Sequence, residues 1–532
     1  AVKVIPFGHP AYGFDITPDG RHVWVSGGDL AVIDTRTKEV VARVKASEKE
    51  TGRLRITSDG KKVVVALEKT LAVFDAGTRR LIGEVALSAA PKVLALSGDG
   101  RHAFLTNPED HSMSVVDLRS LRQVKTVATG RKPDGIAWSP VPAEDPAQAK
   151  ARTLLDKVGL VDGHNDLPWV LREAFASDLS RVDLRKRGAT VDTDIPRLRE
   201  GRVSAQFWSV YIPSGLPNPA RTQLEQIELA RRMIESYPDT FLLATTAADV
   251  ARARQQGKIA SFLGMENGQA IENSLGALRA FHALGVRYMT LTHGRNNDWA
   301  DSATDTATHG GLTPFGREVV REMNRLGMLV DISHVSPDVM KQVLDLSEAP
   351  VLFSHSSARA LVDHRRNVPD DVLARMTQNG GVVMVTFIPP FVSAETAAWG
   401  KGLETSIFNA KTTAEMEQMA KEYAAVHGPA PVATLSQVAD HVEHVARVAG
   451  RDHVGIGSDF YGSPDQPSGL ADVSRFPDLF AELIRRGWTD ADLEKLASGN
   501  ALRAFRGAEA VAARLATNRR PSTATIETLD RR

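Results

Sequence analysis

The stretch GLTPFGREVVREMNRLGMLVDISHVS, Gly311 to Ser336, contains one helix and one strand of a repeating pattern. Thr313 is a typical N-cap residue, Pro314 suits the first helical turn, and Gly327 is a typical helix stop. The apolar residues between them recur at helical spacing: Val319, Val320, Met323 and Leu326. The segment MLVDISH, which follows directly, predicts a buried strand that ends in the polar residue His334.

The same alternation of short apolar runs and helical stretches continues on both sides of this segment. Eight runs are predicted to be strands, and they start at Gly159, Ala205, Ile259, Val286, Met328, Val351, Gly381 and His453. Strands that alternate with helices form a parallel sheet. Eight such units predict a (β/α)8 (TIM) barrel over residues 151–515. The longer segment from Phe391 to Gly450 is expected to be an insertion with extra helices.

A different pattern occupies residues 1–140. The segments ITPDGRHVWV, ITSDGKKVVV and LSGDGRHAFL start at Ile16, Ile56 and Leu96, 40 residues apart. Each unit predicts a strand, an Asp-Gly turn, a second strand, another turn and a third strand. The units resemble YVTN-type β-propeller repeats. About three blades are too few for a closed ring of roughly four to eight, so further blades, another copy of the chain or the following domain would have to complete a partial propeller.

Composition and charge restrict the classes of function. The 532 residues include 65 basic and 65 acidic side chains, so no net charge favours nucleic acid or an anionic membrane surface. The absence of cysteine excludes disulfides, thiolate nucleophiles and cysteine metal sites. A metal ion could therefore be bound only by His, Asp and Glu. The prolines that follow Ser139 predict a linker at residues 141–150, and residues 516–532 are predicted to be a polar tail.

Residues that can bind metal ions end six of the eight predicted strands. They are His164 and Asp166, Glu266, His293, His334, His355 and Asp459. Barrel enzymes keep their active sites at this end of the strands. One strand-terminal histidine is usually structural, but three of them with a glutamate indicate a catalytic metal site for Zn²⁺ or a similar ion. His427, His441 and His444 lack accompanying carboxylates and are interpreted as surface or packing residues.

Six ordered motifs run through the barrel segment. They are DGHNDLPW at Asp162, GMENG at Gly264, LTHGRNNDWADS at Leu291, the stretch quoted above at Gly311, SHSSARALVDHRRNVPDD at Ser354 and GSDF at Gly457. Together they resemble the membrane dipeptidase (renal dipeptidase) family of zinc peptidases over residues 153–506. The resemblance implies a barrel of the metal-dependent hydrolase type. It also implies hydrolysis of dipeptides by a hydroxide bound to two metal ions.

The resemblance further implies a role for each site residue. The implied zinc ligands are His164 and Asp166 for one ion, His334 and His355 for the second, and Glu266 as a bridge between the two ions. His293 corresponds to the histidine that polarises the substrate, Arg366 to the arginine that binds the substrate carboxylate, and Asp459 to the acid/base residue. Two departures border the implied pocket, Asn267 in place of a common glycine and Tyr461 in place of a common aspartate, so no side-chain preference is predicted.

Other functions are left open by the sequence. A dinuclear hydrolase of another amide or a β-lactam would keep the same metal ligands. Alternatively, the propeller-like segment is a binding module and the barrel is inactive. A small dipeptide is the expected partner, without nucleic acid and without a membrane anchor, whereas a homo-oligomer and a partner of the propeller-like segment are left open. A periplasmic or secreted location is expected rather than a cytoplasmic one, because such repeats and many bacterial relatives of these enzymes are exported.

Overall fold

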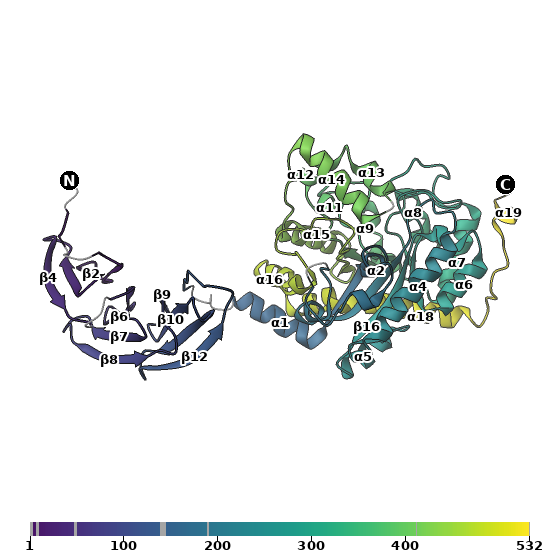
Figure 1. The fold of residues 1–532 in the computed structure, drawn as a ribbon. Coiled ribbons are helices and arrows are strands. Elements are labelled where there is room, and N and C mark those ends of the chain that lie inside the picture. The colour runs from purple at the N-terminus through teal and green to yellow at the C-terminus, as the bar shows by residue number, and fades with distance from the viewer. Residues whose placement is uncertain are drawn as a thin grey trace. The chain divides into compact units, whose positions relative to one another are not determined.

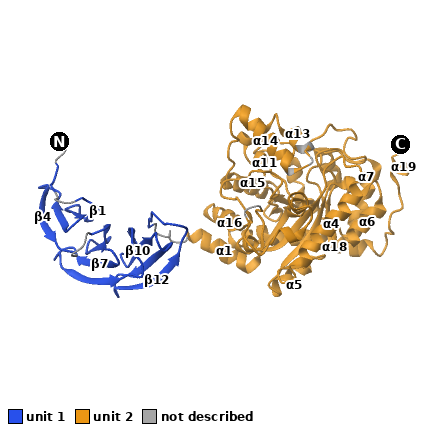
Figure 2. Ribbon diagram, in the orientation of Figure 1, with its two compact units in different colours: residues 1–143 blue, residues 144–532 orange. Residues whose placement is uncertain are grey.

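The structure is a computed structural model of the chain that describes residues 4–6, 10–46, 51–138, 145–188, 191–410 and 412–530. The chain forms two compact units, residues 1–143 and 144–532 (Figure 2). Over the described part of the chain, no helix combines the length and the apolar character needed to cross a membrane.

The first unit contains three antiparallel sheets of four strands each (Figure 1). In chain order the sheets consist of β1 (Gly13–Ile16), β2 (His22–Ser26), β3 (Leu30–Asp34) and β4 (Glu39–Val44); of β5 (Leu54–Ile56), β6 (Lys62–Ala66), β7 (Thr70–Asp75) and β8 (Leu81–Ala86); and of β9 (Val93–Leu96), β10 (His102–Asn107), β11 (Ser112–Asp117) and β12 (Arg122–Ala128). The repeat analysis predicted three strands per unit and missed the fourth. Strands β4, β8 and β12 lie at sheet edges with mostly exposed or half-buried side chains, so they lack a buried apolar run.

Consecutive sheets of the first unit pack through apolar side chains. On β6, Val63 and Val65 share a core cluster with Trp24 of the first sheet, whereas Val64 shares another cluster with Leu105 of the third. Successive side chains of a strand point to opposite faces, so the middle sheet is covered on both faces. The arrangement is consistent with three propeller-like blades.

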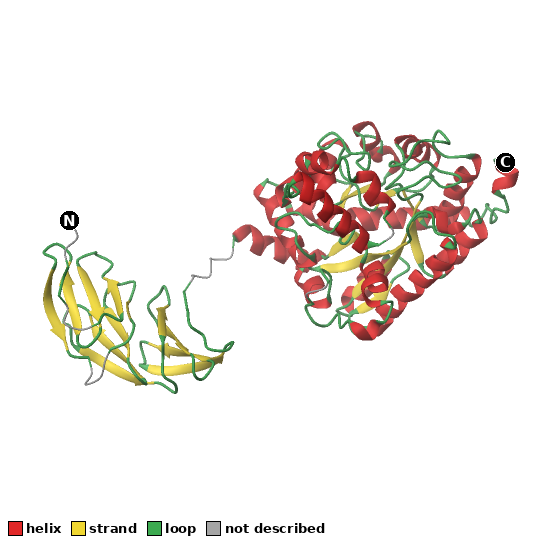
Figure 3. Cartoon of the chain, turned by 45° about the horizontal axis from the view of Figure 1, so that its top comes forward, coloured by secondary structure: helices red, strands yellow, loops and turns green. Residues whose placement is uncertain are grey.

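The second unit contains a closed barrel of eight parallel strands surrounded by helices (Figure 3). Its strands are β13 (Leu160–Asn165), β14 (Val203–Tyr211), β16 (Ile259–Glu266), β17 (Val286–Thr290), β18 (Leu329–Asp331), β19 (Leu352–Phe353), β20 (Val382–Val385) and β21 (Val454–Ile456). All eight predicted strands are present, which confirms the (β/α)8 barrel. The short strand β15 (Phe241–Leu243) pairs with the start of β16 and was not predicted, because three residues are too few to show a period.

The barrel closes where its last strand meets its first. Only one residue pair, Asp162 with Ile456, joins β13 to β21 in the ladder. The Asp162 carboxylate reinforces this junction, because it accepts hydrogen bonds from the backbone N–H and the hydroxyl of Ser458, both at 2.7 Å. A side chain therefore supplies part of the bonding that a longer ladder would provide.

Helices cover the outside of the barrel. They are α1 (Pro146–Val158), α2 (Leu167–Phe175), α3 (Ile195–Glu200), α4 (Pro219–Ser236), α5 (Ala248–Gln255), α6 (Leu275–Ala283), α7 (Pro314–Leu326), α8 (Pro337–Leu346), α9 (Asp370–Leu373), α10 (Met376–Asn379), α15 (Leu435–Val448), α16 (Phe476–Arg485), α17 (Asp490–Glu494), α18 (Asn500–Leu515) and α19 (Ile526–Leu529). Helix α7 forms as predicted: the Thr313 side chain accepts a hydrogen bond from the N–H of Gly316, and Gly327 ends the helix at φ 73°.

An insertion of further helices follows β20, as predicted. It contains α11 (Pro389–Val392), α12 (Ala394–Gly400), α13 (Glu404–Asn409) and α14 (Thr413–His427). After α14 the chain returns to the barrel wall through α15. The insertion therefore adds one group of helices beyond the carboxyl end of β20.

Both ends of the barrel unit differ from the predicted boundaries. Residues 139–144 of the predicted linker region lie outside the described residues. Helix α1 already begins at Pro146, because Asp145 accepts a hydrogen bond from the N–H of Ala147 and proline fits the first turn, so the predicted linker extended too far. The predicted polar tail packs on the barrel unit, where Ile526 is buried and Asp530 accepts a hydrogen bond from the N–H of Phe315.

Candidate metal centre and active site

The residues predicted from the strand ends come together in one buried cluster. His164 lies in β13 and Glu266 ends β16, while the others follow within three residues of β13, β17, β18, β19 and β21. Three groups have ligand atoms within 4.8 Å of one another: His164, Glu266 and His355; Glu266, His293 and His334; and His164, Asp166 and Asp459. Residues separated by almost 300 positions in the sequence therefore meet at the carboxyl ends of the strands.

Glu266 lies at the centre of the cluster, and its two carboxylate oxygens face different histidines. Oε2 is 3.3 Å from Nε2 of His164. Oε1 is 3.0 Å from Nε2 of His334 and 3.5 Å from Nε2 of His355. Although burial raises the pKa of Glu266, the surrounding histidines hold it well below its usual range. An ionised carboxylate in this position suits a bridge between two cations.

The hydrogen bonds around His355 show that the cluster fits metal ions. The Ser354 hydroxyl donates its single proton to Asp331 (2.6 Å), so its oxygen accepts a hydrogen bond from Nδ1–H of His355 (2.7 Å). Burial lowers the pKa of His355 well below its usual value, so the ring is neutral and Nε2 carries a lone pair. Nε2 of His355 lies 2.9 Å from Nε2 of His334 and 3.5 Å from Oε1 of Glu266, and a cation among these three atoms would stabilise the arrangement.

Asp331 and Asp162 support the cluster from inside the strands, and neither was predicted as a site residue. Asp331 accepts hydrogen bonds from the hydroxyls of Ser354 and Thr290 and from two backbone N–H groups. Asp162 accepts from Ser458 and from the side-chain amide of Gln206. A signal existed in the sequence, because each aspartate interrupts an apolar strand two or three residues before a cluster histidine.

Tyr288 positions His164. Its hydroxyl is hydrogen-bonded to Nδ1 of His164 at 2.8 Å and lies 3.3 Å from the carbonyl of Gly163. The neighbouring strand leaves room for this ring only because residue 264 is glycine: a Cβ atom there would lie 2.0 Å from Cζ of Tyr288. The hydrogen bond fixes the orientation of the imidazole, as outer partners of metal-binding histidines commonly do.

Replacing Tyr288 by phenylalanine is expected to lower the zinc affinity of the protein about 10- to 100-fold, because His164 loses its outer hydrogen bond. The affinity is measured by competition with a chromophoric chelator. Tyr237→Phe is the matched control, because Tyr237 is also buried and its hydroxyl accepts a hydrogen bond from the N–H of Leu184, away from the cluster. Equal zinc affinity in the Tyr288 variant and the control would contradict the assigned role.

Two members of the cluster, Asp459 and His293, and the predicted residue Arg366 beside it differ in their charge. Burial raises the pKa of the Asp459 carboxyl well above its usual range, and it lowers the pKa of His293 to about 4, which leaves that ring neutral at pH 7. Arg366 is only 1% exposed, and burial lowers its pKa to about 10, so it stays charged. Among the described residues, Nε and Nη1 of Arg366 have no hydrogen-bond partner. Nη2 donates a long hydrogen bond to the carbonyl of His355 at 3.4 Å. A buried guanidinium with two unpaired nitrogens is suited to binding a carboxylate.

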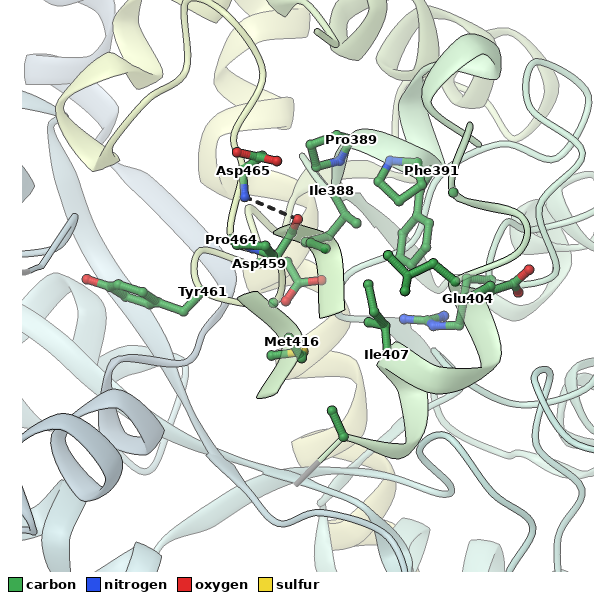
Figure 4. Close-up of a pocket in the computed structure, with 18 of the residues that line it drawn as sticks. Ile388, Pro389, Phe391, Glu404, Ile407, Met416, Asp459, Tyr461, Pro464 and Asp465 are labelled. Atoms are coloured by element: carbon green, nitrogen blue, oxygen red, sulfur yellow. Dashed lines mark hydrogen bonds between the residues drawn. The ribbon is translucent and has the colours of Figure 1, made fainter. Parts of the chain in front are cut away.

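The two departures from the family pattern hold loops in place. Asn267, at φ 94°, accepts a hydrogen bond from the N–H of Gln269 and donates one to the carbonyl of Ile212. The Tyr461 hydroxyl accepts hydrogen bonds from the N–H groups of Asp192 and Thr193, both at 2.8 Å. Figure 4 shows that the Tyr461 ring points away from the other labelled residues. Neither side chain therefore contributes a hydrogen-bonding group to the cluster.

Five members of the cluster line a large pocket: Asp166, Glu266, His293, His334 and Asp459. Figure 4 shows this pocket from the side of Asp459 and the insertion. The empty volume, including the solvent-filled mouth, is about 1390 Å³. One wall carries Trp169 and Tyr211, whose rings pack edge to face with centroids 5.1 Å apart. The other wall is formed by residues from Ile388 onwards in the insertion.

The histidines of α15 lie outside the cluster. His441 is buried, and its Nδ1 accepts a hydrogen bond from the N–H of Ala358. His444 pairs with Asp370 through Nε2 at 2.7 Å. The ring of His427, in the insertion, stacks on Tyr423. The contacts of His441 and His444 join α15 to neighbouring segments, whereas the contact of His427 lies within α14, and none of the three histidines belongs to the metal-binding groups found among the described residues.

His441 is expected to make the protein sensitive to acid, because burial lowers its pKa to about 4. Between the ordinary pKa near 6.5 and about pH 4, the unfolded chain binds a proton that the folded protein does not. The free energy of unfolding therefore falls as the pH is lowered through this range, by at most roughly 3 kcal/mol. His441→Asn keeps an acceptor for Ala358 and should show a smaller loss in urea unfolding between pH 7 and 4.5. If the free energy of unfolding falls equally with pH in the variant and in the original protein, this prediction is contradicted.

The chain is similar to several known proteins. Residues 148–519 match the family model described as membrane dipeptidase (peptidase family M19). The chain is 43% identical over 371 residues to Dipeptidase 3 of Mus musculus and 42% identical to Dipeptidase 3 of Rattus norvegicus, and each match covers 68% of this chain and 67% of the relative.

Solved structures of similar fold cover the same unit. The probable dipeptidase PvdM from Pseudomonas aeruginosa superposes with a TM-score of 0.61 at 26% identity, over 69% of this chain and 100% of that one. A metallo peptidase from Rhodobacter sphaeroides, liganded with a phosphinate mimic of the dipeptide L-Ala-D-Ala, superposes with a TM-score of 0.54 at 25% identity, over 66% of this chain and 99% of that one.

Proposed function

Because the chain belongs to the membrane dipeptidase family (peptidase family M19) and is a hydrolase of the dipeptidase type, we propose that it hydrolyses dipeptides with two zinc ions at the mouth of its barrel. The observation that carries the proposal is the position of Glu266 between two sets of histidines, with one carboxylate oxygen toward each. His164 and Asp166 would hold one ion, His334 and His355 the other, and Glu266 both.

When bound, the ions would lower the pKa of a water molecule toward ~7 and polarise the scissile carbonyl. The protein groups would perform the remaining steps. Asp459, with its raised pKa, would accept a proton from the attacking water and return it to the leaving amine. Neutral His293 would donate a hydrogen bond to the developing oxyanion.

Arg366 would bind the α-carboxylate of the substrate. Its Nε and Nη1 groups have no partner among the described residues and can donate hydrogen bonds to the carboxylate, which would fix the distance between the carboxylate and the scissile bond. Such a contact limits the substrate to very short peptides, because a longer peptide has no carboxylate at that distance. The contact between Arg366 and the substrate carboxylate would distinguish a dipeptidase from a hydrolase of other amides or β-lactams.

Chelation followed by metal add-back tests the proposal. The protein is assayed with L-Ala-L-Ala and L-Ala-D-Ala before chelation, after chelation and after addition of zinc, and activity is expected to disappear and return. The C-terminal amides of the two dipeptides are compared in the same assay and should react at least about 100-fold more slowly, because a site built to pair with a carboxylate is left unpaired. Activity indifferent to the chelator, or equal rates for acid and amide, would contradict the zinc site or the carboxylate contact, respectively.

A further inference from the structure

The pocket extends beyond the cluster into a space lined by the insertion. Most residues that line this space are apolar, among them Ile388, Phe391, Leu403, Ile407 and Met416, and the polar residues Thr396, Glu404 and Thr412 line it too. We call this space the insertion compartment. In Figure 4, Ile388 and Phe391 lie above the Asp459 carboxylate, and Ile407 and Met416 lie below it. Small-molecule sites are typically lined by apolar side chains with a few polar groups that fix the ligand, and this pocket combines such a lining with the cluster and Arg366.

The insertion compartment begins next to Arg366. The guanidinium carbon of Arg366 lies 5.4 Å from the centroid of the Phe391 ring. A carboxylate bound by Arg366 therefore brings the α-carbon of the same amino acid close to Phe391. Trp169 and Tyr211 form another wall of the pocket. This wall contacts the cluster at His293, since the rings of Tyr211 and His293 pack with their centroids 4.8 Å apart.

One carboxylate, Glu404, also lines the pocket, and its Oε1 lies 3.4 Å from Nε2 of His364 and 3.8 Å from Nε of Arg365. This carboxylate would repel an anionic side chain. A large apolar side chain gains by leaving water against the apolar lining. A substrate series that includes Ala-Lys distinguishes a cationic side chain from an apolar one.

We propose that the natural substrates are dipeptides whose C-terminal residue carries a large apolar side chain, which the insertion compartment binds. This proposal rests on the proposed dipeptidase function and assigns a substrate class to it. The apolar lining and the contact between Arg366 and Phe391 both favour this kind of side chain. The compartment determines specificity and takes no part in bond cleavage.

A substrate series tests the proposal with the zinc-loaded full chain. The C-terminal residue is varied in Ala-Ala, Ala-Leu, Ala-Phe, Ala-Lys and Ala-Glu, and the N-terminal residue in Leu-Ala and Phe-Ala, with both configurations of the C-terminal residue. Ala-Leu and Ala-Phe are expected to exceed Ala-Ala in kcat/KM at least about tenfold, with smaller changes in the N-terminal series. Equal kcat/KM values, or a preference for Ala-Lys or Ala-Glu, would overturn the proposal and leave the dipeptidase function standing. Hydrolysis of no dipeptide would overturn both.

Two variants test the compartment itself. Ile407→Ala removes apolar surface and Ala420→Trp fills space in the pocket lining, so each should lower the ratio of kcat/KM for Ala-Phe to that for Ala-Ala at least about fivefold. Val426→Ala is the control on α14, because Val426 is 78% exposed and outside the pocket lining, and it should keep the wild-type ratio. An unchanged ratio in both pocket variants would overturn the proposal, and the ratio remains measurable even if one variant loses stability.

Discussion

Replacing Glu266 by glutamine is expected to reduce kcat/KM for a dipeptide by roughly 100- to 1000-fold. The substitution keeps the shape of the side chain but removes the negative charge that three histidine Nε2 atoms approach within 3.5 Å. Loss of one partner from a buried charged cluster costs about 3–5 kcal/mol. Because one of the two oxygens becomes an amide nitrogen, which cannot bind a metal ion, the variant should also hold less zinc. Activity and metal content are measured on the same purified sample.

Glu272→Gln is the control for this experiment. Glu272 lies six residues further along the chain, is exposed, and accepts a weak hydrogen bond from the N–H of Ala220 at 3.3 Å. Its variant should keep both the zinc content and the activity of the original protein. A Glu266→Gln protein with full zinc content and full turnover would disprove the bridging role, and with it the arrangement of the whole centre.

Asp459→Asn should lower kcat about 100- to 10,000-fold, the range of a lost general acid/base. Asparagine has nearly the same shape and tolerates a positive φ, so it can keep the φ of 63° found at residue 459. We therefore expect the zinc content and the melting temperature to stay close to those of the original protein, and KM to change little. The variant should also lose one limb of the pH profile of kcat.

Asp465→Asn serves as the control, because Asp465 also lines the pocket but is not among the residues grouped around the possible metal positions. Its variant should keep kcat within a small factor. Loss of zinc together with activity in Asp459→Asn would identify Asp459 as a metal ligand instead of a proton carrier. Unchanged kcat would exclude both roles.

The barrel and the cluster could be predicted because both depend on local patterns. Helix α7 has its cap, its apolar face and its stop within one short segment, and the structure retains each of them. The cluster followed from a topological rule: parallel strands bring their carboxyl ends to one side of a barrel. His164, Glu266 and Asp459 could be predicted from the strands that they end, without knowledge of their contacts.

The contacts that support the cluster could not be predicted in the same way. The hydrogen bond from Tyr288 to His164 joins residues 124 positions apart and depends on the missing side chain at Gly264. The composition of the insertion compartment depends on how the insertion helices fold over the cluster, and their sequence shows only that helices form. The propeller-like repeats were visible because they recur, whereas their fourth strands have too few buried residues to stand out.

The junction between the first and last strands of the barrel affects when the cluster can form in a newly made chain. Asp162 and Ser458 are 296 residues apart, so His164 leaves the ribosome long before the last strand exists to enclose it. Contacts over such distances in sequence slow folding, because a long loop must close first. The cluster is therefore expected to form late in folding, and a chain truncated before Ser458 would contain most of its residues without the closed barrel that brings them together.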